Sequence, residues 1–171
     1  MPLWLPGGFV SDAWTRLGDD APAPDEGAIL VSLKRWLAER GTLSARKGPV
    51  GVEIGAGADA QAHLADLVGR PLVALAFAKF ADGRSFSYAR LLRDRYHFKG
   101  ELRAIGDVLI DEVPLMLRCG FDSFEVMDPP TLKALEAGRL PGPPLHYQPG
   151  SGQGERAAGS RPWLRVDRSP A

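Results

Sequence analysis

Residues 72–78 read LVALAFA and carry no polar side chain. A strand with one face in water alternates apolar and polar residues, so this run predicts a strand that is buried on both faces. Such strands lie in the centre of parallel sheets. Four more strand-like runs flank it, at residues 28–33, 50–54, 101–105 and 123–127. Helical spacing between the runs is typical of an α/β protein.

The sequence therefore predicts a parallel sheet of about five strands with covering helices. We expect an open doubly wound sheet first, and a partial barrel of the same βα repeats is the alternative, because local patterns do not decide whether a sheet closes. Pro6, Gly7 and Gly8 also predict a β-hairpin within residues 3–14, since glycine adopts the backbone angles of tight turns.

Helical segments are expected at residues 34–40, 59–68, 86–96, 107–118 and 131–137. Asp59 and Asp107 stand where N-caps are common, so each is expected to begin its helix. Pro114 lies inside the fourth segment, where it would either kink the helix or mark a helix that starts late.

The composition of the chain excludes some classes of protein. The chain has 171 residues, and its 21 basic and 21 acidic residues balance, which argues against a general nucleic-acid-binding protein. No apolar run is long enough to cross a bilayer and the N-terminus does not resemble a signal peptide, so we expect no membrane association and a cytoplasmic location. We expect one α/β domain over residues 1–148 and a disordered Gly/Pro-rich tail over residues 149–171.

The sequence gives little evidence for a metal site or a redox site. One cysteine, Cys119, cannot form an internal disulfide, and it is expected to be a buried, inert thiol. No Cys/His cluster suggests a metal site, and His63, His97 and His146 show no ligand spacing. The pattern Gly55-x-Gly57-x-x-Ala60 stands where a dinucleotide fingerprint would, but it carries little information. The cofactor is therefore unknown.

Ligands of parallel α/β sheets bind at the carboxyl ends of the strands. The turn Asp82-Gly83-Arg84-Ser85 follows the central strand, and it is the strongest candidate for a small-anion site. Arg84 would offer a fork of donors, while Ser85 or Ser87 would lie near the amides at the start of the next helix. The alternative is a structural turn with an Arg84–carboxylate pair.

Four more basic residues of interest follow the central strand in the sequence. Arg90, Arg93 and Lys99 are expected to form a basic rim that faces a partner, or else a solvated face with an Arg90–Asp94 pair. Arg103 lies inside a strand, where its charge needs a partner such as Asp82, Asp107 or Glu101. It is either part of a buried structural pair or a site residue. The weak candidates for catalysis are Asp82, Asp107 and Arg103.

Residues 77–125 read FAKFADGRSFSYARLLRDRYHFKGELRAIGDVLIDEVPLMLRCGFDSFE. This string resembles the signature of the bacterial domain-of-unknown-function family nine-three-four, and a weaker likeness extends from the hairpin to Gln148. Members usually have glycine where this chain has Ser85. They commonly occur beside sulfite reductase, and they are commonly labelled oxidoreductases of sulfite reduction. The family offers no agreed catalytic residues to carry over.

Two functions follow from the resemblance and the residues together. The first is an accessory protein of assimilatory sulfite reduction, whose basic rim meets sulfite reductase or another sulfate-assimilation protein. The second is a small α/β oxidoreductase or other enzyme that acts on an anionic sulfur substrate with a nucleotide cofactor. In that enzyme Asp82 or Asp107 would move a proton, while Arg84 and Arg103 would stabilise negative charge.

Overall fold

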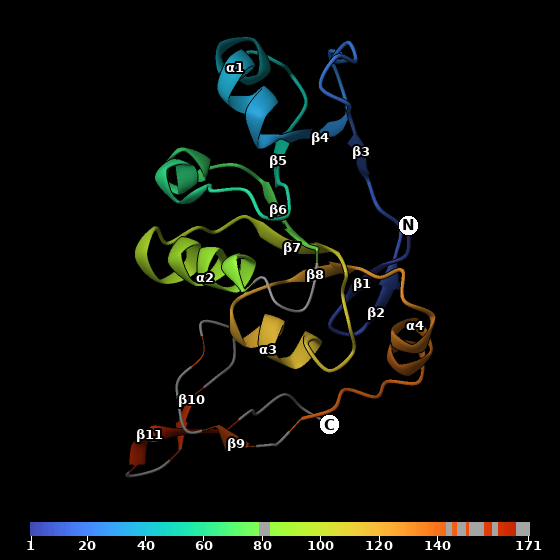
Figure 1. Ribbon diagram of the computed structural model, residues 1–171, viewed down its shortest axis with the longest axis vertical. Helices are drawn as coiled ribbons and strands as arrows, with labels where there is room; N and C mark the ends of the chain where they lie inside the picture. The colour runs from blue at the N-terminus through green and yellow to red at the C-terminus, as the bar shows by residue number, and fades with distance from the viewer. Residues whose placement is uncertain (79–82, 143–144, 147–149, 151–155, 159–160, 167–171) are drawn as a thin grey trace.

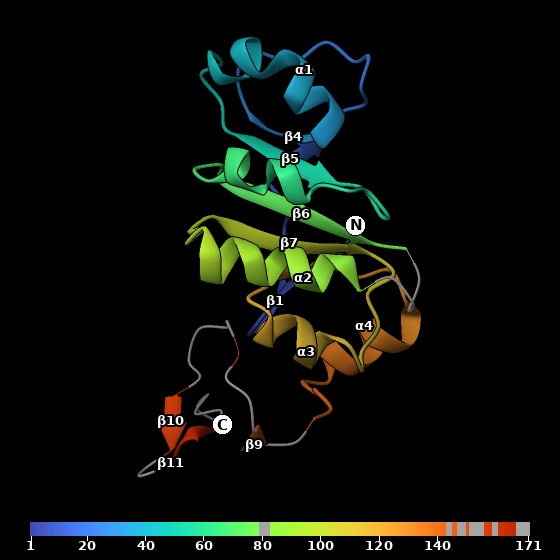
Figure 2. The same ribbon diagram turned by 60° about the vertical axis from the view of Figure 1, so that its left-hand side comes forward.

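A computed structural model describes residues 1–78, 83–142, 145–146, 150, 156–158 and 161–166. The strands of the main sheet are β1 (Leu3–Leu5), β2 (Gly8–Val10), β3 (Trp14–Arg16), β4 (Ala28–Ser32), β5 (Val50–Ile54), β6 (Leu72–Phe77), β7 (Glu101–Gly106) and β8 (Ser123–Glu125). They form one eight-stranded sheet in the order β2-β1-β8-β7-β6-β5-β4-β3. The strands β3 to β8 are parallel and follow one another in chain order. Figure 2 shows β4 to β7 side by side in this order.

Helices connect most of the parallel strands. They are α1 (Leu33–Ser44), the 3₁₀ helix η1 (Gln61–Leu67), α2 (Arg84–Arg90) with its π-helical continuation η2 (Leu91–Arg95), α3 (Val113–Arg118) and α4 (Pro129–Glu136). Because the strand order never reverses and crossovers are right-handed, the connecting helices lie on one face of the sheet, while α4 packs near β2 (Figure 1). None of the helices in the described ranges has the length and apolar character that crossing a membrane requires.

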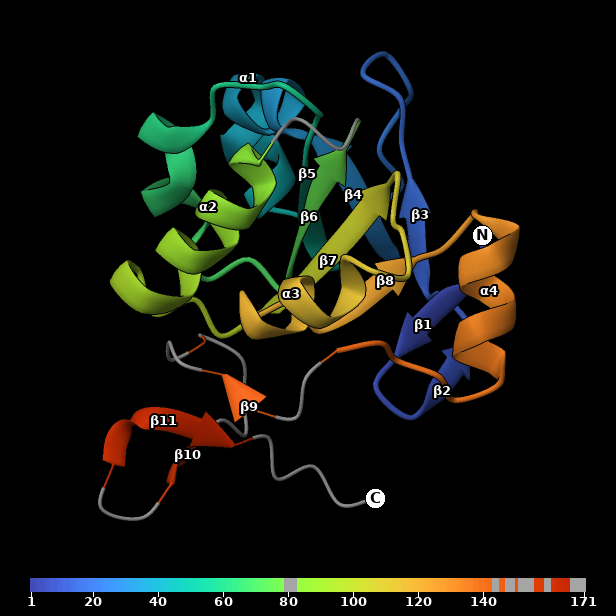
Figure 3. The same cartoon turned by 60° about the horizontal axis from the view of Figure 1, so that its bottom comes forward.

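The sheet is strongly curled. Strands β2 and β3 stand at opposite ends of the strand order, yet only residues 11–13 separate them in the chain. Two edges of a flat eight-stranded sheet would lie about 34 Å apart, whereas the step from Val10 to Trp14 spans at most about 14 Å. The strands therefore form a half-barrel, and the N-terminal segment runs along its open side from β2 to β3 (Figure 3).

The prediction of an α/β fold and of an N-terminal hairpin is confirmed. The prediction of about five strands in an open doubly wound sheet is wrong, and the curled half-barrel corresponds to the alternative. Strands β1, β2 and β3 have three residues each, which is too short for a visible alternation. A doubly wound sheet would also need a reversal of strand order, which this sheet lacks.

Two predicted helix starts are also wrong. Ala60, not Asp59, precedes η1, and α3 begins at Val113 rather than at Asp107. Pro114 lies in the first turn of α3, so it marks a helix that starts late and causes no kink. Cys119 is buried, as predicted.

The main core lies between the sheet and the helices. It is built from alternate strand residues such as Val52, Leu75 and Ala104, none of which is exposed. A smaller apolar cluster of Leu30, Leu72, Ala74 and Ile105 lies on the concave face. A second sheet is formed by β9 (Leu145–His146), β10 (Arg156–Ala158) and β11 (Arg161–Val166). Strands β10 and β11 lie in the segment 149–171 that the sequence assigns to the tail.

Candidate functional site

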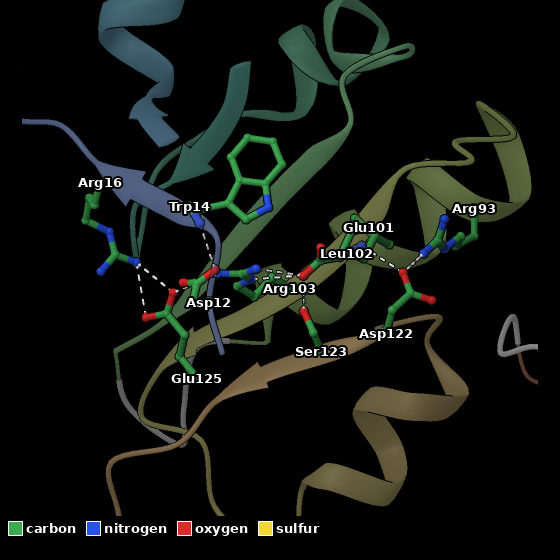
Figure 4. Close-up of polar contacts among 10 residues, drawn as sticks. All are labelled: Asp12, Trp14, Arg16, Arg93, Glu101, Leu102, Arg103, Asp122, Ser123 and Glu125. Atoms are coloured by element: carbon green, nitrogen blue, oxygen red, sulfur yellow. Dashed lines mark hydrogen bonds and ion pairs between the residues drawn. The ribbon is translucent and has the colours of Figure 1, made fainter. Parts of the chain in front are cut away.

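Charged side chains gather on the concave face of the half-barrel (Figure 4). Strand residues alternate between the two faces of a sheet, so the neighbours of the core positions point into the concavity. The charged residues are Asp12 before β3, Arg16 on β3, Glu53 on β5, Glu101 and Arg103 on β7, and Glu125 on β8, and the polar Ser123 on β8 lies among them. The sequence indicates only Arg103 and Glu101 as members of such a group.

Arg103 is the centre of this network. Its side chain is 1% exposed, and Nη1 donates to Oδ2 of Asp12 at 2.8 Å. Nε donates to Oε1 of Glu101 at 3.0 Å, and a carboxylate oxygen of Glu125 lies 3.5 Å from Nη1. Burial alone would lower the pKa of Arg103, but the hydrogen bond to Asp12 and the charge of Glu101 outweigh it and raise the pKa. Arg103 thus remains cationic in a nearly closed site.

Arg16 joins strands that are far apart in the sheet order. Its Nε donates to Glu53 on β5 at 2.7 Å, and its Nη2 lies 3.2 Å from Glu125 on β8. Burial opposes the charge of Arg16, but the charges of Glu53 and Glu125 raise its pKa overall. Because Glu125 contacts both arginines, Arg16 and Arg103 belong to one network that crosses the concavity.

The network has more negative than positive charge. Four carboxylates, from Asp12, Glu53, Glu101 and Glu125, meet only two guanidinium groups. The hydroxyl of Ser123 donates to Glu101, and Asp12 also accepts the backbone N–H of Trp14 at 3.1 Å. Arg103 is therefore surrounded by acids, and an anionic ligand would meet a repulsive potential beside it.

The predicted anion site lies at the carboxyl edge of the sheet. Arg84 is exposed, and its Nη1 donates to the carbonyl oxygen of Gly57 at 2.6 Å. The Ser85 hydroxyl donates to the carbonyl oxygen of Ala76 at 2.8 Å, and Ser87 is exposed on the first turn of α2. Arg84 thus ties the turn after β5 to the start of α2, and Asp82 lies outside the described residues.

Asp107 begins an acidic loop at the same edge. It is exposed, and its backbone N–H donates to the carbonyl oxygen of Phe77 at 2.7 Å. Burial raises the pKa of Glu112, and the charges of Asp111 and Asp107 raise it further. Asp107 is not among the contacts of Arg103 in the described residues, since Arg103 lies inside β7 and Asp107 lies beyond its end.

The three residues of the predicted basic rim differ in their surroundings. Arg90 is about half exposed and lies 3.3 Å from Asp94, which is the surface pair that the sequence suggests. Lys99 is exposed. Arg93 is 13% exposed, and its guanidinium donates to the carbonyls of Phe98, Gly100 and Gly120 and to the Asp122 carboxylate. Arg93 thus fixes the turn before β7.

Asp122 completes that buried contact. Its carboxylate accepts hydrogen bonds from Arg93 and from the backbone N–H of Leu102, the latter at 2.8 Å. Burial raises the pKa of Asp122, although both hydrogen bonds oppose the rise. Within the described part of the chain, no three His, Cys, Asp or Glu side chains are grouped so that they could hold a metal ion.

Sequence reasoning missed Asp12, Arg16, Glu53 and Glu125. Glu53 and Glu125 interrupt otherwise apolar strands, and this is the same signal that draws attention to Arg103. Their common face is visible only once the strand register is known. Asp12 and Arg16 lie in a segment with no recognisable strand pattern, so nothing in the local sequence places them against β7 and β8.

Comparison with known proteins gives one match. The family described as "Bacterial protein of unknown function (DUF934)" matches residues 51–157, which is more than half of the chain. No curated protein and no solved structure matches. The chain therefore belongs to the DUF934 family, and the resemblance in residues 77–125 is confirmed at the level of the family.

Proposed function

We propose that this member of the DUF934 family is an accessory protein of assimilatory sulfite reduction in the cytoplasm, and that it binds an acidic partner protein. The resemblance of residues 77–125 supports the pathway, because proteins with this signature occur beside sulfite reductase. The role of a partner-binding protein, in preference to that of an enzyme, rests on the surroundings of Arg103.

The enzyme alternative needs Arg103 to stabilise the negative charge of a sulfur substrate. Arg103 is 1% exposed and is in contact with the carboxylates of Asp12, Glu101 and Glu125. An arginine whose charge is already balanced by three acids has little attraction left for an anion. The described geometry therefore favours a structural Arg103 and a function that lies on the outer surface.

The partner surface that we propose consists of Arg90 and Lys99, with Arg93 as its internal support. Both Arg90 and Lys99 are exposed, and Arg93 holds the carbonyls of Phe98 and Gly100 on either side of Lys99 at 2.7 and 3.0 Å. The backbone that carries Lys99 is thus fixed. Exposed basic side chains on a fixed backbone favour rapid association with an acidic protein.

We also propose that a small anion binds at the start of α2. Arg84 is exposed there, and its hydrogen bond to Gly57 brings the backbone of the 55–59 turn beside the first turn of the helix. The amides at a helix start and a guanidinium group attract oxyanions. Stabilisation by sulfite or sulfate in thermal unfolding that is smaller in Arg84→Ala than in the natural chain would support this site. Equal shifts in both proteins would contradict it.

The partner proposal is tested by binding of the purified protein to the separate subunits of sulfite reductase. We expect the double variant Arg90→Glu/Lys99→Glu to weaken binding at least about tenfold, because opposite charges then become like charges. Lys133→Glu on the exposed side of α4 is the matched control and should bind as the natural chain does. Absence of binding to every subunit, or equal loss in the control, would overturn the proposal.

A further inference from the structure

A second cluster of cations surrounds Trp36, where α1 meets η1. The Trp36 side chain is 2% exposed, and the guanidinium carbon of Arg70 lies 4.5 Å from the centre of its ring. The guanidinium carbon of Arg40, one turn further along α1, lies 5.9 Å from the same ring. Stacking on an aromatic ring holds a guanidinium in one orientation and is itself favourable. One buried indole therefore positions two arginines.

The charges of these two arginines are balanced unequally. Arg40 lies 2.9 Å from Asp66, and the hydrogen bond from Arg40 lowers the pKa of Asp66 despite some desolvation. His63 lies 3.7 Å from the same carboxylate. Arg70 forms no ion pair with any carboxylate of the described residues. The cluster therefore has one carboxylate for two guanidinium groups, and Arg70 is the cation that it leaves unbalanced.

The cluster also has buried hydrogen-bond donors without acceptors. Among the described residues, the buried side-chain N–H groups that lack an acceptor are Nε1 of Trp36 and Nε of Arg70. Both belong to this one cluster. A buried donor without an acceptor costs about 1–3 kcal/mol, so it is uncommon in folded proteins. The cluster thus lacks a carboxylate for Arg70, and two of its buried donors lack an acceptor within the protein.

The turn that carries Lys99 precedes β7. A Cβ atom on Gly100 would clash with the carbonyl oxygen of Arg70 and would lie 2.9 Å from that of Pro71. This close approach places the turn that carries Lys99 beside the backbone of Arg70. Lys99 precedes Gly100 and is exposed, so it is a third cation whose backbone lies close to that of Arg70.

We propose that Arg70, with Arg40 and Lys99 beside it, binds a tetrahedral oxyanion of the sulfate or phosphate class. Such an ion supplies the missing charge, and its several oxygens accept hydrogen bonds from a guanidinium fork. The ion is either free or the end group of a larger molecule. This site is built from other residues than the one at the start of α2, where Arg84 is bonded to Gly57.

Isothermal titration with inorganic sulfate and phosphate, at constant ionic strength with chloride as the reference anion, tests the site. In the Arg84→Ala background, which lacks the anion site proposed at the start of α2, we expect saturable binding. Adding Arg70→Met, which removes the guanidinium, should raise the dissociation constant at least about tenfold. Arg70→Lys keeps the charge but loses the fork and the stacking, so its affinity should fall between the two. Arg139→Met, which removes an exposed arginine after α4, is the matched control.

Each outcome has a defined meaning. Tighter binding of a phosphate monoester such as glycerol phosphate than of inorganic phosphate would identify the oxyanion as an end group. Equal affinity of both would identify a free ion. Non-saturable heats, or equal binding by Arg70→Met and Arg139→Met, would overturn the proposal. If Arg70→Met does not fold, unchanged sulfate affinity in Arg70→Lys and Lys99→Met would overturn it as well.

Discussion

On the face of the sheet that the helices cover, apolar side chains from neighbouring strands pack against the helices, whereas on the concave face charged side chains pair with one another. Leu75 and Arg103 illustrate the contrast, because they stand on adjacent strands at exposures of 0% and 1% and are held by opposite kinds of interaction. Burial alone therefore does not reveal which force holds a strand in place. Three substitutions separate the two forces, and a fourth tests a loop in which acids face one another.

The largest effect is expected at Arg103. Replacing it with methionine keeps most of its volume but leaves Asp12, Glu101 and Glu125 close together without the central cation. Breaking a buried ion pair by removing one partner costs about 3–5 kcal/mol in the free energy of unfolding, which urea denaturation measures. Arg90→Met removes an arginine from an exposed pair and should cost less than about 1 kcal/mol. Similar losses in both variants would show that the concave network is not structural.

Leu75→Ala makes the corresponding change on the helix-covered face. Leu75 is fully buried in the main core, so truncation leaves a cavity and should cost about 2–5 kcal/mol. Because the lost interaction carries no charge, the loss should be the same at low and high salt, whereas that of Arg103→Met should change. Unfolding in urea at two salt concentrations measures both. A strong salt dependence for Leu75→Ala would remove the contrast between the faces.

Asp12→Asn tests how firmly the N-terminal segment is fastened to the concave face. The substitution keeps the shape of the side chain, but it removes the charge that meets Arg103 at 2.8 Å. We expect a loss of about 1.5–3 kcal/mol, as for a hydrogen bond to a charged group. Arg103→Met should lower the free energy of unfolding less in the Asp12→Asn background than in the natural chain, because the two residues form one pair. Full additivity would contradict the pairing, and Asp94→Asn on the surface is the control.

The same two faces show what the sequence could predict and what it could not. The apolar run at residues 72–78 predicts a central parallel strand, because a buried strand needs apolar side chains on both faces. The curl of the sheet becomes apparent only when β2 and β3 are known to lie at opposite ends of the strand order. Residues 11–13 are then too few to join the two edges of a flat sheet. Arg103 draws attention in the sequence, but its partners Asp12 and Glu125 come from distant segments. Long-range pairing of charges leaves no local pattern.

The smallest effect is expected at Glu112, where acids face other acids instead of arginines. Burial, with Asp111 and Asp107, raises the pKa of Glu112 above its ordinary value of 4.5, so the folded chain holds this proton more tightly than the unfolded chain does. The stability from this group is present below the ordinary pKa and is lost as the pH rises through the raised one. Glu112→Gln should therefore gain stability relative to the natural chain as the pH rises, by well under about 1 kcal/mol at neutral pH. Urea unfolding across this range, with Glu136→Gln on α4 as control, measures the gain. A loss at neutral pH would mean that Glu112 is paired with a cation, as the carboxylates of the concave face are.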